Sequence, residues 1–146
     1  MNVEELQKKD VPYILEIWKR AGDVFGIPYK QEINELIEGK RFLCIRENGK
    51  IVAMSGYKVM KKQPEVRIVH LWVAKTYRRK GLAVALIKEL MERGGNLALT
   101  ACCKEGAENN KFYDRFAINY ETETKKTMNV RKYYLDKEKI WQTNKT

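Results

Sequence analysis

The chain has 146 residues and a mass of 17.2 kDa, which is enough for one compact domain and too little for two ordinary ones. Its residues are 44% hydrophobic and 33% charged, which argues against general disorder, and no stretch has the ~18 consecutive apolar residues of a membrane-spanning helix. Lys and Arg number 29 against 19 Asp and Glu, and the net charge of +10 favours anionic partners such as nucleic acid, phosphorylated cofactors or acidic proteins.

The N-terminus and the few cysteines indicate a protein of a reducing compartment without a metal site. The first ten residues, MNVEELQKKD, lack the apolar run of a signal peptide, so we expect a cytoplasmic protein that does not bind membranes. Neighbours on a strand point to opposite faces, which makes Cys102 and Cys103 a poor disulfide pair. With Cys44 they are expected to be reduced, buried, small apolar groups. A single histidine, His70, and the lack of a CxxC pair argue against a zinc site, and no metal is expected.

The first part of the chain predicts a short strand followed by two helices. Residues 1–7 fit a short strand, and Asp10 is a candidate N-cap for the first helix. That helix ends near Gly22, and its apolar side chains follow at helical spacing: Val11, Ile14, Leu15 and Trp18. Residues 31–38 predict a second, shorter helix.

From residue 41 the hydrophobic pattern changes from helical to strand-like spacing. Residues 41–47 and 51–60 predict two antiparallel strands, because Asn48-Gly49 near the end of the first is a strong hairpin turn. Residues 66–74 predict a further strand, and their apolar content indicates a central place in the sheet.

The second half of the chain alternates helices with strands. An amphipathic helix over 82–91 ends at Gly94-Gly95 and leads into a buried strand over 96–103. The chain then continues with a short helix over 107–116, strands over 118–124 and 127–135, and a polar tail from Asp136 that is expected to fray.

These elements predict the fold class. The crossover over 66–103 implies two parallel strands, whereas the Asn-Gly hairpin implies antiparallel ones. The sequence therefore predicts an α/β fold with a mixed sheet, in a single domain over residues 1–146.

The stretch over 71–87, LWVAKTYRRKGLAVALI, is the most informative part of the sequence. An apolar strand ends in a basic loop with one glycine, and a helix starts there. Such a place suits a phosphate group, because backbone N–H groups and the positive end of the helix dipole point at it. Gly81 lets the backbone come close to a ligand, and Arg78, Arg79 and Lys80 add positive charge. The loop fits neither the Walker A pattern nor the GxGxxG fingerprint of dinucleotide sites.

This stretch resembles the acetyl-CoA signature of the GNAT superfamily of N-acetyltransferases. That signature reads [Arg/Gln]-x-x-Gly-x-[Gly/Ala] and follows a strand of the form Leu-x-Val. Arg78, Gly81 and Ala83 fill the signature, and Leu71 and Val73 fill the strand at the usual spacing.

A second stretch, FYDRFAI over 112–118, is similar to the end of a later helix of that family. Two departures stand out: Ala117 and Ile118 replace the usual Gly-Phe, and Gly106 stands where an Asn is common. Asn109 lies nearby and is taken as a cofactor contact by this resemblance.

The resemblance implies a GNAT-like domain with a mixed, mostly antiparallel sheet flanked by helices. The parallel strands 66–74 and 96–103 would splay apart to hold acetyl-CoA as acyl donor, and the acetyl group would pass directly to a primary amine. Members of the family are often dimers, so a homodimer is one expectation. The implied cofactor contacts are Leu71, Trp72, Val73, Arg78, Arg79, Lys80, Gly81, Leu82, Ala83, Val84 and Asn109.

The resemblance also implies a general acid, but it leaves the base open. Tyr113 stands where the family has the phenol that protonates the departing thiolate, which its ordinary pKa near ~10 permits. Arg67 replaces the glutamate that many members carry as a base. Glu65, His70 or water could serve instead, and no base is assigned.

Three alternatives remain beside this reading. The basic surface would also suit an acyltransferase that acts on a base amine of tRNA or DNA. The other two are a non-catalytic acyl-CoA-binding protein and a basic nucleic-acid-binding module, both on the same fold.

Phe25 and Tyr29 are expected on the acceptor side by resemblance alone. Cys102 and Cys103 are expected to pack rather than to act as nucleophiles, because no activating base is evident beside them.

Overall fold

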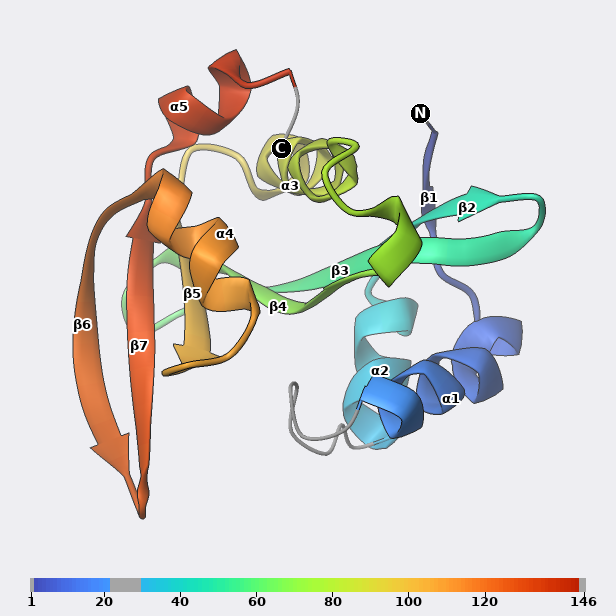
Figure 1. The fold of residues 1–146 in the computed structure, drawn as a ribbon, viewed down its shortest axis with the longest axis horizontal. Helices are drawn as coiled ribbons and strands as arrows, with labels where there is room; N and C mark the ends of the chain where they lie inside the picture. Colours follow the sequence, from blue (N-terminus) through green and yellow to red (C-terminus); the bar gives the residue numbers. More distant parts are fainter. Residues whose placement is uncertain (1, 22–29, 145–146) are drawn as a thin grey trace.

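The strands form one mixed sheet that runs through the molecule (Figure 1). The computed structural model describes residues 2–21 and 30–144, and within them seven strands pair in the order β1-β2-β3-β4-β5-β7-β6. Only β4 and β5 are parallel, and the other neighbours are antiparallel, so the predicted mixed sheet is confirmed. The strands are β1 (Val3–Glu5), β2 (Phe42–Glu47), β3 (Lys50–Met60), β4 (Glu65–Val73), β5 (Ala98–Lys104), β6 (Ala117–Lys125) and β7 (Met128–Leu135).

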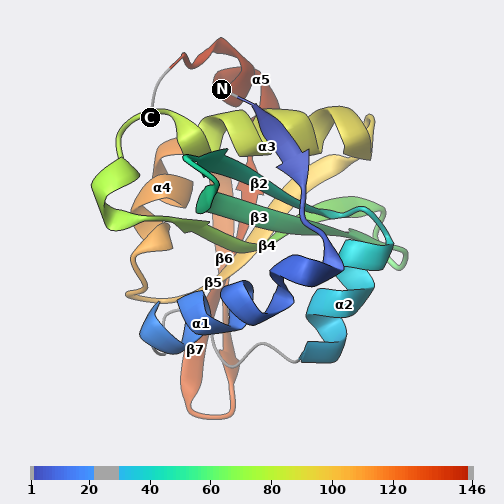
Figure 2. The same ribbon diagram turned by 90° about the vertical axis from the view of Figure 1, so that its right-hand side faces the viewer.

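Helices cover both faces of the sheet. Figures 1 and 2 show α3 on one face, and α1 and α2 on the other. The helices are α1 (Val11–Ala21), α2 (Lys30–Glu38), α3 (Leu82–Gly94), α4 (Asn109–Phe116) and α5 (Lys137–Gln142). Among the residues that the structure describes, no helix is long and apolar enough to cross a membrane.

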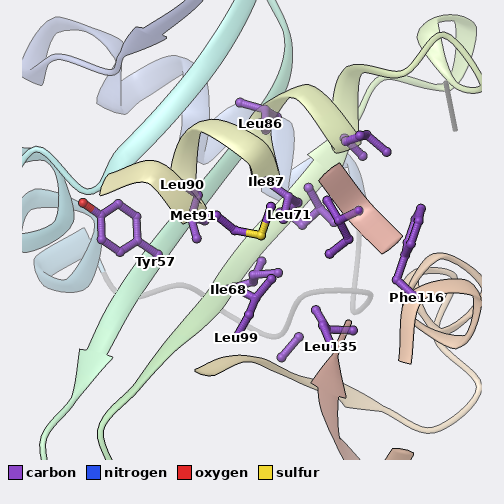
Figure 3. Packing of buried hydrophobic residues seen from close by; sticks show 14 of the residues in the cluster. Tyr57, Ile68, Leu71, Leu86, Ile87, Leu90, Met91, Leu99, Phe116 and Leu135 are labelled. Carbon is purple, nitrogen blue, oxygen red and sulfur yellow. The ribbon is translucent and has the colours of Figure 1, made fainter. Parts of the chain in front are cut away.

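Two apolar clusters hold these layers together. On one face, α3 buries the side chains of Leu86 and Leu90 toward Ile68 and Leu71 of β4 and Leu99 of β5 (Figure 3). Leucines four residues apart share one face of a helix, so α3 presents a continuous apolar stripe to the strands. On the other face a second cluster lies between the sheet and α1 and α2. The part of the sheet formed by β2 and β3 is therefore packed on both faces.

The expectation that the tail from Asp136 frays is wrong for the residues of α5. The Asp136 side chain accepts a hydrogen bond from the Lys139 N–H at 3.1 Å and so caps this helix. Ile140 is fully buried in the cluster beneath α3, and the Lys88 ammonium donates to the Thr143 carbonyl at 2.7 Å. Two adjacent apolar residues, Ile140 and Trp141, in a polar segment give no helical periodicity, which is why the sequence pattern missed this element.

If α5 belongs to the core, Ile140→Ala should lower the free energy of unfolding by about 2–5 kcal/mol, because it removes a fully buried side chain. Urea unfolding followed by tryptophan fluorescence would measure the change. Lys139→Ala, on the exposed side of the same helix, is the matched control and should change stability by less than about 0.5 kcal/mol. Equal effects of the two variants would contradict the packing of α5.

Candidate active site

β4 and β5 pair over only part of their lengths. The parallel ladder joins Glu65 to Ala98 and ends at Ile68 and Ala101, after which β5 pairs only with β7. The backbone of β4 beyond residue 68 therefore faces an opening between the two strands. A ligand that carries amide groups can pair with such an unpaired strand edge.

A bulge in β4 lies at the point where the strands part. Met54 of β3 pairs with Trp72 and Gly56 with Val69, so two residues of β4 lie opposite one residue of β3. The first of the two, His70, has a left-handed φ of 56°. A bulge bends its strand and increases its twist, and this one turns β4 away from β5.

A cleft of about 1010 Å³ opens at this divergence. Its walls come from α1, the β2–β3 hairpin, the end of β4, the loop into α3 and the start of α4. Eight of the predicted cofactor contacts line it: Leu71, Trp72, Val73, Arg78, Arg79, Leu82, Ala83 and Asn109.

The charge around the cleft is strongly positive. Glu47 and Glu108 are the acidic side chains among its lining residues. The basic ones are Arg20, Lys50, Lys75, Arg78, Arg79 and Lys111. Six basic groups against two acidic ones make this a place for a ligand with several negative charges.

The N-terminus of α3 opens onto the same cleft. Gly81 is its N-cap with a left-handed φ of 81°, and a glycine has no side chain with which to cap the first turn. No acidic residue lies in the first turn either. The first N–H groups of a helix have no partner within the helix and carry its partial positive charge, so this end suits a phosphate.

The three remaining predicted cofactor contacts lie outside the residues that line the cleft. Lys80 is exposed, with its ammonium 5.0 Å from the centre of the Tyr77 ring. Val84 is buried in the core beneath α3, so only its backbone could face a ligand. Gly81 lies at the helix start itself.

Two side-chain contacts tie the walls of the cleft together. Asn109, at the start of α4, donates to the Leu71 carbonyl at 2.9 Å and so bridges α4 and β4. Arg78 donates to the Val73 carbonyl at 3.2 Å and forms an ion pair with Glu108. No sequence pattern indicated Glu108, because it lies 30 residues from its partner.

Sequence comparison then decides the family. The profile of the Acetyltransferase (GNAT) family matches residues 7–117, which is most of the chain. The chain belongs to this family. No curated protein sequence matches it significantly.

Solved structures of acetyltransferases share the fold. A ribosomal-protein-alanine N-acetyltransferase from Brucella melitensis is 14% identical with a TM-score of 0.67 over 92% of this chain and 100% of that one. Ard1 from Thermoplasma volcanium is 17% identical with a TM-score of 0.71 over 92% and 98%. Diaminobutyrate acetyltransferase EctA from Paenibacillus lautus, solved with coenzyme A and L-2,4-diaminobutyric acid, is 12% identical with a TM-score of 0.72 over 92% and 94%. At these identities the likeness concerns the fold alone.

Tyr113, where GNAT proteins have a general acid, lies one helical turn beyond Asn109 on α4. It is 3% exposed, and its ring packs against those of Phe112 and Tyr133. Burial, reinforced by the nearby thiol of Cys103, raises the pKa of the phenol well above its ordinary value. The phenol therefore keeps its proton, as a donor must, although its side chain is not among those that line the cleft.

The carboxylate of Glu65, a candidate base, is held by hydrogen bonds from neighbouring strands. Glu65 lies at the start of β4, six residues before Leu71, and accepts hydrogen bonds from Thr100 and, at 2.9 Å, from Lys132. Burial alone would raise its pKa, but these hydrogen bonds outweigh burial and lower it. The ionised carboxylate thus links β4 to β5 and β7.

The cysteines differ in exposure. Cys44 is buried as expected, but the same expectation is wrong for Cys102, which is exposed. Cys102 follows Ala101, the last residue of β5 that pairs with β4. From Cys102 onward β5 therefore has a strand neighbour on the β7 side alone. Burial raises the pKa of the Cys103 thiol to about 11, which keeps it protonated and a poor nucleophile. Phe25 and Tyr29 lie outside the described residues.

Glu65→Gln should lower the free energy of unfolding at pH 7 by about 3 kcal/mol, because it replaces a buried carboxylate and leaves the partly buried ammonium of Lys132 without its counter-charge. The folded-state pKa of Glu65 is lowered, so its stabilising effect is complete above the unfolded value near ~4.3 and is lost as pH falls through the folded value. Urea unfolding of parent and variant from pH 7 to pH 3 should show the difference shrinking below about pH 4. Glu123→Gln, on the exposed strand β6, is the control, and a difference that stays constant with pH would contradict this account.

Proposed function

We propose that this chain transfers an acetyl group from acetyl-CoA to a primary amine. The observation that carries the proposal is the junction of β4 and α3: a strand end that no longer pairs with β5 leads through a basic loop to a helix N-terminus with a glycine N-cap, in a cleft with six basic lining residues. Acetyl-CoA has a pantetheine arm with two amide groups at one end and three phosphates at the other. The strand end of β4 would face the amides, and the N-terminus of α3 would face the phosphates.

The cofactor would lie along the junction. The pantetheine amides would pair with the backbone of Leu71 and Val73, where β4 has left β5. The pyrophosphate would sit on the first turn of α3, with Arg79 beside it. Arg78 is paired with Glu108 and would hold the loop rather than carry most of the phosphate binding. Coenzyme A bound to the diaminobutyrate acetyltransferase, which shares this fold, supports a CoA ligand.

The transfer would be direct, from thioester to amine. A neutral amine attacks the carbonyl carbon, the C–N bond forms, the C–S bond breaks, and the thiolate needs a proton. Tyr113 would supply that proton, because burial raises the pKa of its phenol and keeps it protonated at neutral pH. The protonated state of Cys103 argues against an acyl-cysteine intermediate.

Gly81→Glu should abolish acetyl-CoA binding, because it puts a carboxylate at the helix N-terminus where the phosphates would sit. Isothermal titration calorimetry with acetyl-CoA would measure this. Gly95→Glu is the matched control: Gly95 follows the other end of α3 and also has a left-handed φ, of 73°, with open space around a Cβ. It carries the same charge, and its backbone (φ 73°, ψ −143°) tolerates a side chain less well than that of Gly81 (φ 81°, ψ 11°), yet it should bind acetyl-CoA like the parent.

Equal loss of binding in both glycine variants would contradict the phosphate site at Gly81. Failure of the parent to bind acetyl-CoA would overturn the proposed function. The basic surface would then become the leading feature, and binding of tRNA or DNA at low salt, weakening steeply as salt rises, would be the next measurement.

Tyr113→Phe should lower kcat by roughly 10²-fold or more while leaving acetyl-CoA affinity nearly unchanged, since it removes a proton donor and keeps the ring that packs on Tyr133. Thiol release from acetyl-CoA with a panel of small primary amines would report kcat, and calorimetry the affinity. Tyr120→Phe, on exposed β6, serves as the control. Unchanged turnover of Tyr113→Phe would exclude the acid role.

A further inference from the structure

His70 lies at the level where β4 leaves β5. It is two residues beyond Ile68, the last residue of β4 in the parallel ladder, and it occupies the bulge. Leu71 points into the core beneath α3, whereas the ring of His70 packs on the opposite face against Trp18, with ring centres 4.8 Å apart. Tyr13, Ile17 and Arg20 of α1 line the cleft from this second face, so an acceptor would approach from the side on which His70 lies. The His70 side chain itself is behind the residues that line the cleft.

A carboxylate from another element holds this imidazole. Nε2 of His70 lies 3.1 Å from Oε1 of Glu32 on α2, and the same oxygen lies 2.8 Å from the ammonium of Lys58 on β3. The His70–Glu32 pair is partly accessible to solvent, because the side chains of His70 and Glu32 are 12% and 25% exposed. The contact with Lys58 shows that an alkylammonium group fits against this carboxylate.

The protonation states of the pair follow from its surroundings. Burial lowers the pKa of His70 below its ordinary 6.5 even though Glu32 acts in the opposite direction, and Lys58 lowers it further. For Glu32, burial raises the pKa, but the hydrogen bonds from Lys58 and His70 outweigh burial and lower it. At neutral pH the imidazole is therefore neutral and the carboxylate ionised. An ionised carboxylate only accepts hydrogen bonds, so Nε2 carries the proton and Nδ1 keeps a lone pair.

We propose that His70 is the general base of acetyl transfer and that Glu32 is the positioning residue that fixes its tautomer. The inference rests on the proposed function. Nδ1 of His70 takes one proton from the acceptor ammonium, and the neutral amine then forms the C–N bond as the C–S bond breaks. Tyr113 protonates the departing thiolate and regains a proton from the nitrogen of the new amide. His70 later releases its proton to water, so one ammonium and one thioester give one amide, one thiol and one proton.

This assignment fills the role that the sequence left open. Glu65 is bound to Thr100 and Lys132 at the far end of β4, and Arg67 replaces the glutamate of other family members. The pair also separates two jobs: Glu32 orients the ring, and Nδ1 remains to take the proton.

The first test uses the protein without any ligand. His70 is the one histidine in the sequence, so its ring nitrogens give unambiguous signals in a long-range ¹H–¹⁵N NMR spectrum. We expect the Nε2–H tautomer at pH 7 and a pKa below 6.5. In Glu32→Gln the pKa should fall further, because the carboxylate that favours the charged imidazole is gone. An Nδ1–H tautomer, a charged imidazole at pH 7, or a pKa that does not respond to Glu32→Gln would overturn the proposal.

The second test measures thiol release from acetyl-CoA against pH, with water alone and with a panel of small primary amines. His70→Asn suits a left-handed φ and should lower kcat/KM by roughly 10²-fold with unchanged acetyl-CoA affinity. Glu32→Gln should keep partial activity and move the acid limb of the profile to lower pH. Glu35→Gln, an exposed carboxylate on the same helix, should match the parent.

The outcomes separate the two proposals. If the parent binds and consumes acetyl-CoA but His70→Asn keeps its rate and pH profile, the base assignment is wrong and the proposed function stands. If the parent binds no acetyl-CoA, the proposed function fails and His70 has no transfer step to serve. A loss of rate in His70→Asn together with the shifted acid limb of Glu32→Gln supports the pair, since a purely structural contact would not move a pH profile.

Discussion

The separation of β4 from β5 is the constraint on which the rest of the site depends. Below Ile68 the two strands are held by a parallel ladder, and above it the bulge at His70 bends β4 away. One backbone feature thereby opens the cleft, leaves the edge of β4 unpaired and carries the chain to the start of α3. The packing of Leu71 under α3 fixes this geometry, because the bulge can neither slide nor flatten without exposing a core side chain.

The positive charge of the protein has two different uses. Some basic side chains neutralise carboxylates in the body of the fold, as Lys132 does with Glu65 and Arg46 with Asp10 at 2.7 Å. Others gather around the cleft, where acidic lining residues are few. The second group creates a potential that attracts an anionic ligand, whereas the ion-paired groups are already cancelled by acidic residues in the net charge of +10.

Much of the fold could be predicted from the sequence because its signals are local. The Asn48-Gly49 turn fixes a hairpin, and the apolar spacing of α3 fixes a helix face. The phosphate-binding end of the candidate site is equally local, since a strand, a basic loop, Gly81 and a helix follow one another along the chain. The helix α5 was missed because one buried side chain, Ile140, leaves no periodic pattern.

The sequence by itself determined the family, the order of the elements and the place where a phosphate could bind, because each depends on residues close together in the chain. Only the tertiary structure decided the partners of the ionisable groups. Glu32 meets His70 across 38 residues, Arg78 meets Glu108 across 30 and Glu65 meets Lys132 across 67. Such pairs form because separate helices and strands pack at a particular distance and angle, and no pattern along the chain encodes that packing.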